Sequence, residues 1–167
     1  SAGLFSTAEL SLLEARKEIA LMGQRCQRAF DLVVSMHGIE KDDDFNAIFK
    51  KVEKYEGITD NMEYEIAHYL QQVADGHISD EAKRQIQRML REVDDLESVG
   101  DCCYNLARTL SRKRTKCKEH FTQEQMIHIS EMEQLVKLSL MQMIETLEMP
   151  EGEGHDIWTL PTTFDLS

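Results

Sequence analysis

The sequence predicts an all-α protein, an antiparallel up-and-down bundle of four long helices. Two observations support this fold class. The chain of 167 residues contains only two prolines, Pro150 and Pro161, so residues 1–149 can form helices without interruption. Along these residues, apolar side chains recur at alternating spacings of three and four, which places them on one face of a helix. Helices with such faces and short connections pack as antiparallel neighbours in a bundle.

The first two helices have clear start signals. A capping box, Ser6-Thr7-Ala8-Glu9, begins the first helix, which is expected to end near Gly38. Its apolar stripe consists of Leu12, Ala15, Ile19, Met22, Cys26, Ala29, Val33 and Met36. The second helix is expected to follow the aspartates at 42–44, which suit the positive end of a helix dipole. Its stripe consists of Phe45, Ile48, Val52, Tyr55, Thr59, Met62, Ile66, Tyr69 and Val73.

Two further helices follow a turn at residues 75–79, where Ser79 is the expected N-cap. The stripe of the third helix is Ile86, Met89, Val93, Leu96, Gly100, Cys103, Ala107 and Leu110. A second capping box, Thr122-Gln123-Glu124-Gln125, precedes the fourth stripe of Ile129, Met132, Val136, Ser139 and Met143. The predicted bundle therefore covers residues 6–149. Residues 150–167 have no helical period and are expected to lie outside the core.

Composition excludes several classes of function. The chain has 31 acidic and 19 basic residues, a net charge of −12, which argues against nucleic-acid binding. No apolar run reaches 18 residues and no signal peptide precedes Ser6, so no membrane span is expected. The four cysteines lack C-x-x-C spacing and are expected to be reduced thiols. Neither a nucleophile arrangement nor a glycine-rich phosphate loop occurs, so no motif supports nucleophilic catalysis or direct binding of nucleotide or phosphate.

The most informative residues are two E-x-x-x-D pairs, Glu56 with Asp60 and Glu97 with Asp101. At this spacing both carboxylates of a pair lie on one face of their helix. If the second and third helices form a hairpin that turns near residue 78, all four carboxylates face one another at one level. Four such groups without histidine suit hard or borderline cations such as Fe, Mn or Mg. The alternative is a solvated acidic face that binds no metal.

At these residues the sequence resembles the phosphate-uptake regulator PhoU. The motifs are V-x-x-Y-E-x-x-T-D at 52–60, D-D-L-E-S-V-G-D at 94–101 and N-L-A at 105–107. The similarity is greater to the PhoU-like domain that follows the membrane part of bacterial sodium/phosphate cotransporters. The segment L-L-E-A-R-K-E-I at 12–19 is similar to the helix that joins those two parts.

The resemblance implies a three-helix repeat, here followed by a fourth helix, in which E/D-x-x-x-D pairs bind metal clusters, often iron or zinc. Glu56, Asp60, Glu97 and Asp101 match those positions. It further implies no enzymatic activity, but a regulatory domain at the cytoplasmic face of the membrane, with the transporter domain of the same polypeptide as its partner. A stand-alone phosphate-signalling regulator and a metal-free interaction module that forms a homodimer are the alternatives.

Two features leave alternatives open. The fourth helix echoes the first at an offset of 110 residues, either because any two amphipathic helices align or because it begins a second repeat. Six basic residues lie between Arg108 and Lys118 with no acidic one among them. They either complement a helix C-terminus or bind an anionic partner, and direct lipid contact is not favoured because the run lies far from the N-terminus.

Overall fold

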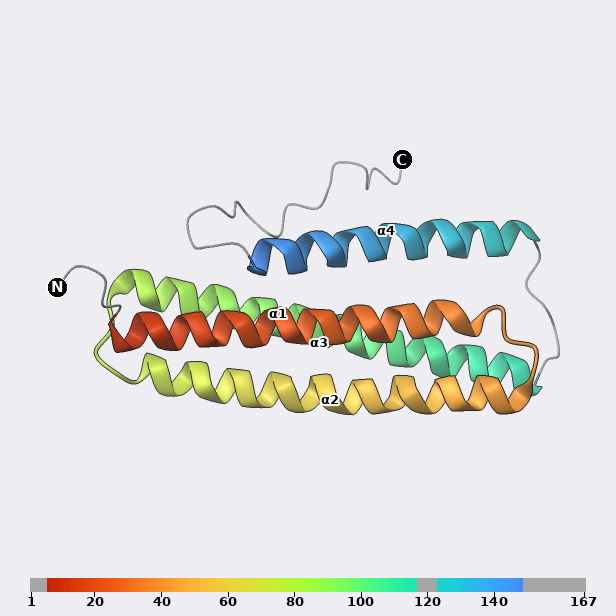
Figure 1. Cartoon of the computed structure of the whole chain (residues 1–167), viewed down its shortest axis with the longest axis horizontal. Helices are drawn as coiled ribbons and strands as arrows, with labels where there is room; N and C mark the ends of the chain where they lie inside the picture. The colour runs from red at the N-terminus through yellow and green to blue at the C-terminus, as the bar shows by residue number, and fades with distance from the viewer. Residues whose placement is uncertain (1–5, 117–122, 149–167) are drawn as a thin grey trace.

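The computed structural model describes residues 6–116 and 123–148, and these residues confirm the predicted all-α fold. Four helices, α1 (Thr7–Met36), α2 (Asp42–Ala74), α3 (Asp80–Lys116) and α4 (Gln123–Glu148), follow one another along the chain. They run up and down in alternation, with their axes close to parallel (Figure 1). The described residues contain no strand.

The expected helix starts are present in the structure. Ser6 and Glu9 form both hydrogen bonds of the capping box that begins α1. Three aspartates occupy the first turn of α2, and the Ser79 hydroxyl accepts a hydrogen bond from the Ala82 amide at 3.1 Å at the start of α3. Thr122, the expected cap of α4, lies outside the described residues.

Helices α1, α2 and α3 enclose one hydrophobic core, because each of them packs against the other two. Every residue of the predicted stripes of α1 and α3 is buried. In the stripe of α2 the partly buried Val73 still packs against the core, and only the prediction of Tyr69 was wrong. Leu70 is fully buried in its place and Tyr69 is exposed, because 3.6 residues per turn shift the inward face by one position over a helix this long.

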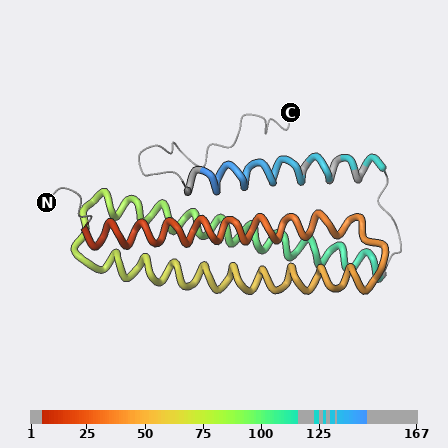
Figure 2. Tube along the Cα trace, in the orientation of Figure 1, coloured from red at the N-terminus to blue at the C-terminus, as the bar shows by residue number. Residues whose placement is uncertain are grey.

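Helix α4 packs on α1, and among the described helices its backbone comes close to that of α1 alone. The Ile144 side chain lies over Gly23, where a Cβ atom would come within 2.9 Å of Ile144 Cγ1. Closer to the other end of the contact, a Glu133 carboxylate oxygen lies 2.7 Å from His37 Nε2. Helix α4 stops well before the N-terminal turns of α1 (Figure 2). It therefore lies on the three-helix unit from one side and does not close a four-helix bundle.

One member of the basic run, Arg114, has a structural role. Its guanidinium donates hydrogen bonds to Asp42 Oδ1 at 2.8 Å and to the carbonyl oxygens of Ile39 and Glu40. It also lies over the Phe45 ring, 4.5 Å from the centroid. The C-terminal end of α3 thereby holds the connection between α1 and α2. This agrees with a structural role for part of the run.

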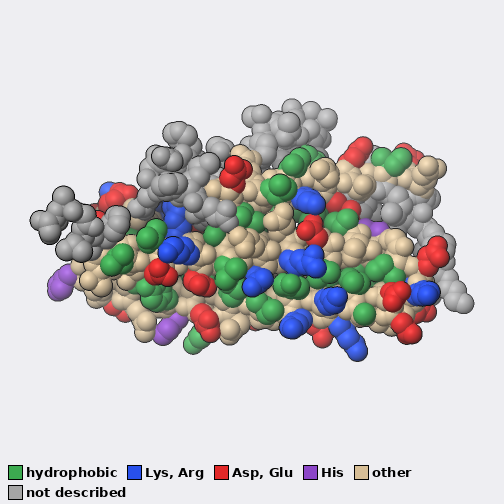
Figure 3. All heavy atoms as spheres, viewed as in Figure 1, with side chains coloured by type: hydrophobic (Ala, Val, Ile, Leu, Met, Phe, Trp, Pro, Cys, Tyr) green, Lys and Arg blue, Asp and Glu red, His purple; other side chains and the backbone are tan. Residues whose placement is uncertain are grey.

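Acidic, basic and hydrophobic side chains are interspersed over α1 and α2 in the view of Figure 3. Within the described ranges, no helix combines the length and hydropathy that a membrane span requires. Cys26 and Cys103 are buried free thiols and Cys102 is an exposed one, whereas Cys117 falls outside these ranges. Residues 149–167 also fall outside them, so the boundary at residue 150 stays a prediction.

Candidate metal centre

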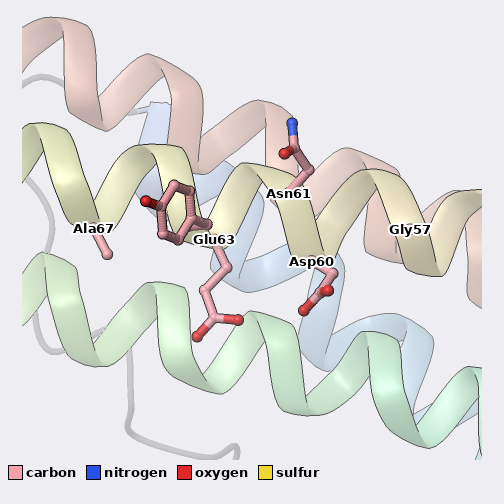
Figure 4. A pocket seen from close by; sticks show the side chains of 6 residues that line it. Gly57, Asp60, Asn61, Glu63 and Ala67 are labelled. Atoms are coloured by element: carbon pink, nitrogen blue, oxygen red, sulfur yellow. The ribbon is translucent and has the colours of Figure 1, made fainter.

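Helix α2 presents three carboxylates on the side that faces α3. Glu56, Asp60 and Glu63 follow one another at spacings of four and three residues, so they share one face. In Figure 4, the side chains of Asp60 and Glu63 point from α2 toward α3. Helix α3 contributes Glu97 and Asp101, one turn apart.

Small side chains bring the two helices close together at this level. Gly100 is buried, and a Cβ atom at this position would lie 3.0 Å from Thr59 Oγ1. The Thr59 hydroxyl in turn donates to the Glu56 carbonyl oxygen at 3.1 Å, and its side chain is buried. On the other side of α3, the Cys26 thiol of α1 bonds the Leu96 carbonyl oxygen at 3.3 Å. The residues next to the carboxylates are therefore closely packed and joined by hydrogen bonds.

Three of the carboxylates converge on one point. Asp60, Glu63 and Glu97 each offer an oxygen, and these oxygens all lie within 4.8 Å of one another. Asp101 extends the cluster through a hydrogen bond with Glu97, and Glu56 lies near enough to Asp60 and Asp101 for their charges to act on it. We call these five residues, Glu56, Asp60, Glu63, Glu97 and Asp101, the carboxylate cluster.

The proximity of the carboxylates raises their affinity for protons. The hydrogen bond with Asp101, with burial and the charges of Asp101, Glu63 and Asp60 behind it, raises the pKa of Glu97 to about 7. Burial and neighbouring carboxylates raise the pKa values of Glu56 and Glu63 as well. Like charges at this spacing favour neutralisation, either by protons or by a cation that replaces them.

The cluster borders an open pocket on α2 of about 640 Å³, which is lined by Gly57, Asp60, Asn61, Glu63, Tyr64 and Ala67 (Figure 4). Gly57 has no atom within 4 Å of the position that a Cβ atom would occupy. Tyr64 is exposed on the rim, where its ring stacks on that of His68 at 6.2 Å. Small ions thus have open access to Asp60 and Glu63 from solvent.

The structure brings all four carboxylates of the sequence prediction to one level between α2 and α3. It adds Glu63, which the search for E-x-x-x-D pairs missed. The sequence contained the information needed to find it. Glu63 follows Asp60 by three residues, a spacing that keeps it on the helix face of Glu56 and Asp60. Of the two glycines beside the motifs, only Gly100 lies at a close approach of helices.

The model of the PhoU domain family matches residues 19–110, more than half of the chain. The chain belongs to the PhoU domain family. The matched residues extend from α1 to the C-terminal part of α3 and include the whole carboxylate cluster, whereas α4 lies beyond them.

Membership associates the chain with phosphate-related regulation, since PhoU proteins are regulatory and not enzymatic. The chain shows no significant similarity to a curated protein or to a solved structure.

Proposed function

We propose that this PhoU domain is the regulatory domain of a sodium-dependent phosphate transporter, and that it binds metal ions through the carboxylate cluster. Family membership supports the regulatory role. The observation that carries the metal proposal is the convergence of Asp60, Glu63 and Glu97 from two helices, with oxygens within 4.8 Å of one another.

The donor set fits a hard or borderline cation. All its donors are carboxylate oxygens, which suit Mg, Mn and Fe better than Zn, since zinc in proteins prefers sulfur and nitrogen ligands. In the proposed centre, Asp60, Glu63 and Glu97 hold the metal, while Asp101 orients Glu97 and Glu56 adds negative charge. The metal supplies positive charge that replaces protons, and it thereby links α2 to α3.

Regulation follows from the two helices that the centre joins. Repulsion between carboxylates favours separation of α2 from α3, and a bound cation opposes that separation. Metal occupancy, or docking of the domain on the transporter at the cytoplasmic face of the membrane, then selects between forms that permit or limit transport.

Thermal unfolding tests the metal proposal. The protein is treated with EDTA and then titrated with Mn²⁺, and in a second series with Fe²⁺ under reducing, anaerobic conditions. Binding to the folded state alone adds about 3 kcal/mol of stability at a hundredfold excess over Kd, and so the midpoint rises. Glu97→Gln and Glu63→Gln are expected to abolish the rise. Glu65→Gln is the matched control, because Glu65 is exposed on α2 and bonds Asn61 outside the cluster.

A midpoint of thermal unfolding that stays unchanged across both metal titrations would contradict metal binding by the carboxylate cluster. An equal rise in all three variants would place the bound ion elsewhere. Elemental analysis of purified parent and Glu97→Gln protein gives an independent reading of occupancy.

A second candidate function is a helical interaction module, and the one-sided packing of α4 favours it. Ile127, Leu138 and Met141 are exposed on α4, so a second copy of the chain has an apolar flank to contact. This module predicts dimerisation that is independent of metal and of Glu97. Sedimentation of the parent and Glu97→Gln proteins separates the two candidates.

The transporter assignment has its own test. A multi-span hydrophobic segment encoded upstream of Ser1 is expected. A stand-alone signalling regulator would lack this segment.

A further inference from the structure

Basic side chains are most concentrated over the middle of α1 and α2 in the view of Figure 3. Arg25 and Arg28 of α1 are exposed there, as are Lys51 and Lys54 of α2. We call these four residues the basic patch. Among the residues that the structure describes, none of the four takes part in an ion pair. Their charges are therefore available to a ligand from outside the bundle.

The antiparallel pairing of α1 and α2 brings these four charges to one level of the bundle. Residues 37–41 connect the two helices, so both helices can be measured from this connection. At a rise of about 1.5 Å per residue, Arg25 and Arg28 lie about 17 and 12 Å before the end of α1. Lys51 and Lys54 lie about 14 and 18 Å after the start of α2. The patch therefore occupies a section of the bundle only about 6 Å long.

The patch lies on the side of α2 away from α3 and on the side of α1 away from α4. Lys51 precedes Asp60 by nine residues, which is about two and a half turns, so Lys51 lies across α2 from the carboxylate cluster. Arg25 follows Gly23, over which Ile144 lies, by two residues, and is therefore about 200° around α1 from that contact. Neither the carboxylate cluster nor the α4 contact shares this surface.

Exposed acidic residues limit the patch at both ends. Asp44 and Glu65 lie on the same side of α2 as the two lysines, one before them and one after them. On α1, Glu18 lies two turns before Arg25. The whole chain has a net charge of −12. An extended anionic surface, such as a lipid bilayer, would meet these acidic residues together with the patch. A short acidic segment would meet the patch alone.

We propose that the basic patch is the docking site for a short acidic segment of a protein partner. Four positive charges within one short section are complementary to the carboxylates of such a segment, and complementary charge accelerates association and fixes the register of binding. The acidic residues at both ends of the patch limit the length of the segment that can bind. The inference does not depend on metal binding, because the patch and the carboxylate cluster lie on different sides of α2.

Fluorescence anisotropy with a labelled hexaglutamate peptide tests the proposal on the full chain of 167 residues. All titrations contain EDTA, so that no metal ion can join the peptide to the carboxylate cluster. We expect the parent protein to bind the peptide, and added NaCl to weaken this binding, because salt screens exposed charges. Hexaglutamine, the neutral counterpart, is expected not to bind. The double variant Arg25→Glu/Lys51→Glu is expected to weaken binding of hexaglutamate about tenfold.

Lys83→Glu/Arg112→Glu is the matched control, because it changes the net charge by the same amount at two exposed residues of α3. Neither residue has an ion pair within the described part of the chain. This control is expected to bind hexaglutamate as the parent does. Arg25→Lys/Lys51→Arg keeps the positive charges and is expected to retain binding. Circular dichroism checks that every variant keeps the helix content of the parent.

Three outcomes would overturn the proposal. The first is a parent protein that does not bind hexaglutamate at low salt. The second is equal weakening in both charge-reversed double variants, because binding would then depend on net charge and not on the patch. The third comes from co-sedimentation with phosphatidylglycerol vesicles, to which we expect no binding. Vesicle binding that is lost in Arg25→Glu/Lys51→Glu would assign the patch to a lipid surface.

Discussion

The three-helix unit and α4 are built from similar amphipathic sequences but are held in different ways. In the unit, α1, α2 and α3 each contact the other two, so the apolar stripe of each helix is enclosed from two sides. Helix α4 has a stripe of the same period, but among the described helices its backbone comes close to that of α1 alone. Three of its larger apolar side chains, Ile127, Leu138 and Met141, consequently remain exposed.

This difference shows that periodicity decides which residues face a neighbour, but not how many neighbours a helix has. Closure of the unit also determines where the carboxylate cluster forms, since the cluster lies between two helices that are both fixed by α1. Helix α4 contributes no residue to it. We therefore expect the stability of the fold and the chemistry of the cluster to belong to the unit, and α4 to detach without loss of either.

The largest expected effect contrasts one leucine from each region. Leu96 of α3 is fully buried, and Leu96→Ala is expected to lower the free energy of unfolding by about 2–5 kcal/mol through lost burial and a cavity. Leu138 of α4 is half exposed, and Leu138→Ala is expected to change the free energy of unfolding by less than about 0.5 kcal/mol. Urea unfolding followed by circular dichroism measures both. Equal losses would contradict the difference between the two regions.

The second prediction concerns pH and the buried carboxyl of Glu92 in the unit. Burial raises the pKa of Glu92 to about 7 against the partial opposition of Arg16, Arg88 and Arg91. Because the folded pKa lies above the unfolded value of about 4.3, this group stabilises the folded state in acid, and its contribution is lost as the pH rises through 7. Between these two pKa values, about 4.3 and about 7, the free energy of unfolding falls by about 3 kcal/mol because of this group.

Glu92→Gln is expected to flatten the dependence of the urea midpoint on pH between 5 and 8 and to be more stable than the parent at pH 8. Glu97, whose pKa also lies at about 7, adds a further pH dependence of the same sign. If Glu97 binds metal as proposed, the pH dependence that it contributes disappears when Mn²⁺ is present. The pH dependence that Glu92 contributes remains. A profile of Glu92→Gln that is as steep as that of the parent would assign the titration to other groups.

The third prediction detaches α4. Gly23→Val introduces side-chain atoms where Ile144 lies, and overpacking of this kind costs about 1–3 kcal/mol. Amide hydrogen exchange is expected to rise throughout α4 and to stay unchanged in α2 and α3. Gly57→Val is the matched control, because no atom lies within 4 Å of a Cβ at Gly57. Loss of protection in α3 as well would show that α4 unfolds together with the unit.

The smallest expected effect compares the two glycines beside the carboxylate pairs. Gly57→Ala is expected to raise stability by about 1 kcal/mol, because alanine has the higher helix propensity and the site is open. Gly100→Ala brings a methyl group against the Thr59 hydroxyl and disturbs its bond to the Glu56 carbonyl oxygen, so we expect a less stable protein than the parent. Thermal unfolding measures both. A gain for Gly100→Ala would mean that α2 and α3 can separate at the cluster without cost.

Most of the fold was predictable because local signals specify it. The capping box at Ser6 and the cap at Ser79 involve residues three positions apart, and the sequence contains everything that such bonds need. The wrong choice of Tyr69 over Leu70 shows the limit. A strict alternation of three and four drifts from the true helical turn, and only contact with α1 and α3 shows which of two neighbouring residues is buried.

The candidate site was predictable in part. The antiparallel register of one hairpin is enough to bring the pair at 56 and 60 to the level of the pair at 97 and 101. Glu63 was missed because the search followed a motif and not the whole face of the helix. The contact of Gly100 with Thr59 depends on the separation of two helix axes, and no pattern within a single helix contains that distance.

The sequence by itself therefore determined the four helices, the inward faces of α1 and α3 and the level at which acidic side chains meet, because each depends on neighbours within a few turns or on the register of a single hairpin. Tertiary structure alone decided that α4 packs on one helix, that Ile144 lies over Gly23, and that Glu63 and not Glu56 joins Asp60 and Glu97 in the closest group. These outcomes depend on the distances and rotations between packed helices. Those quantities are set by the shapes of all the side chains in the interfaces together.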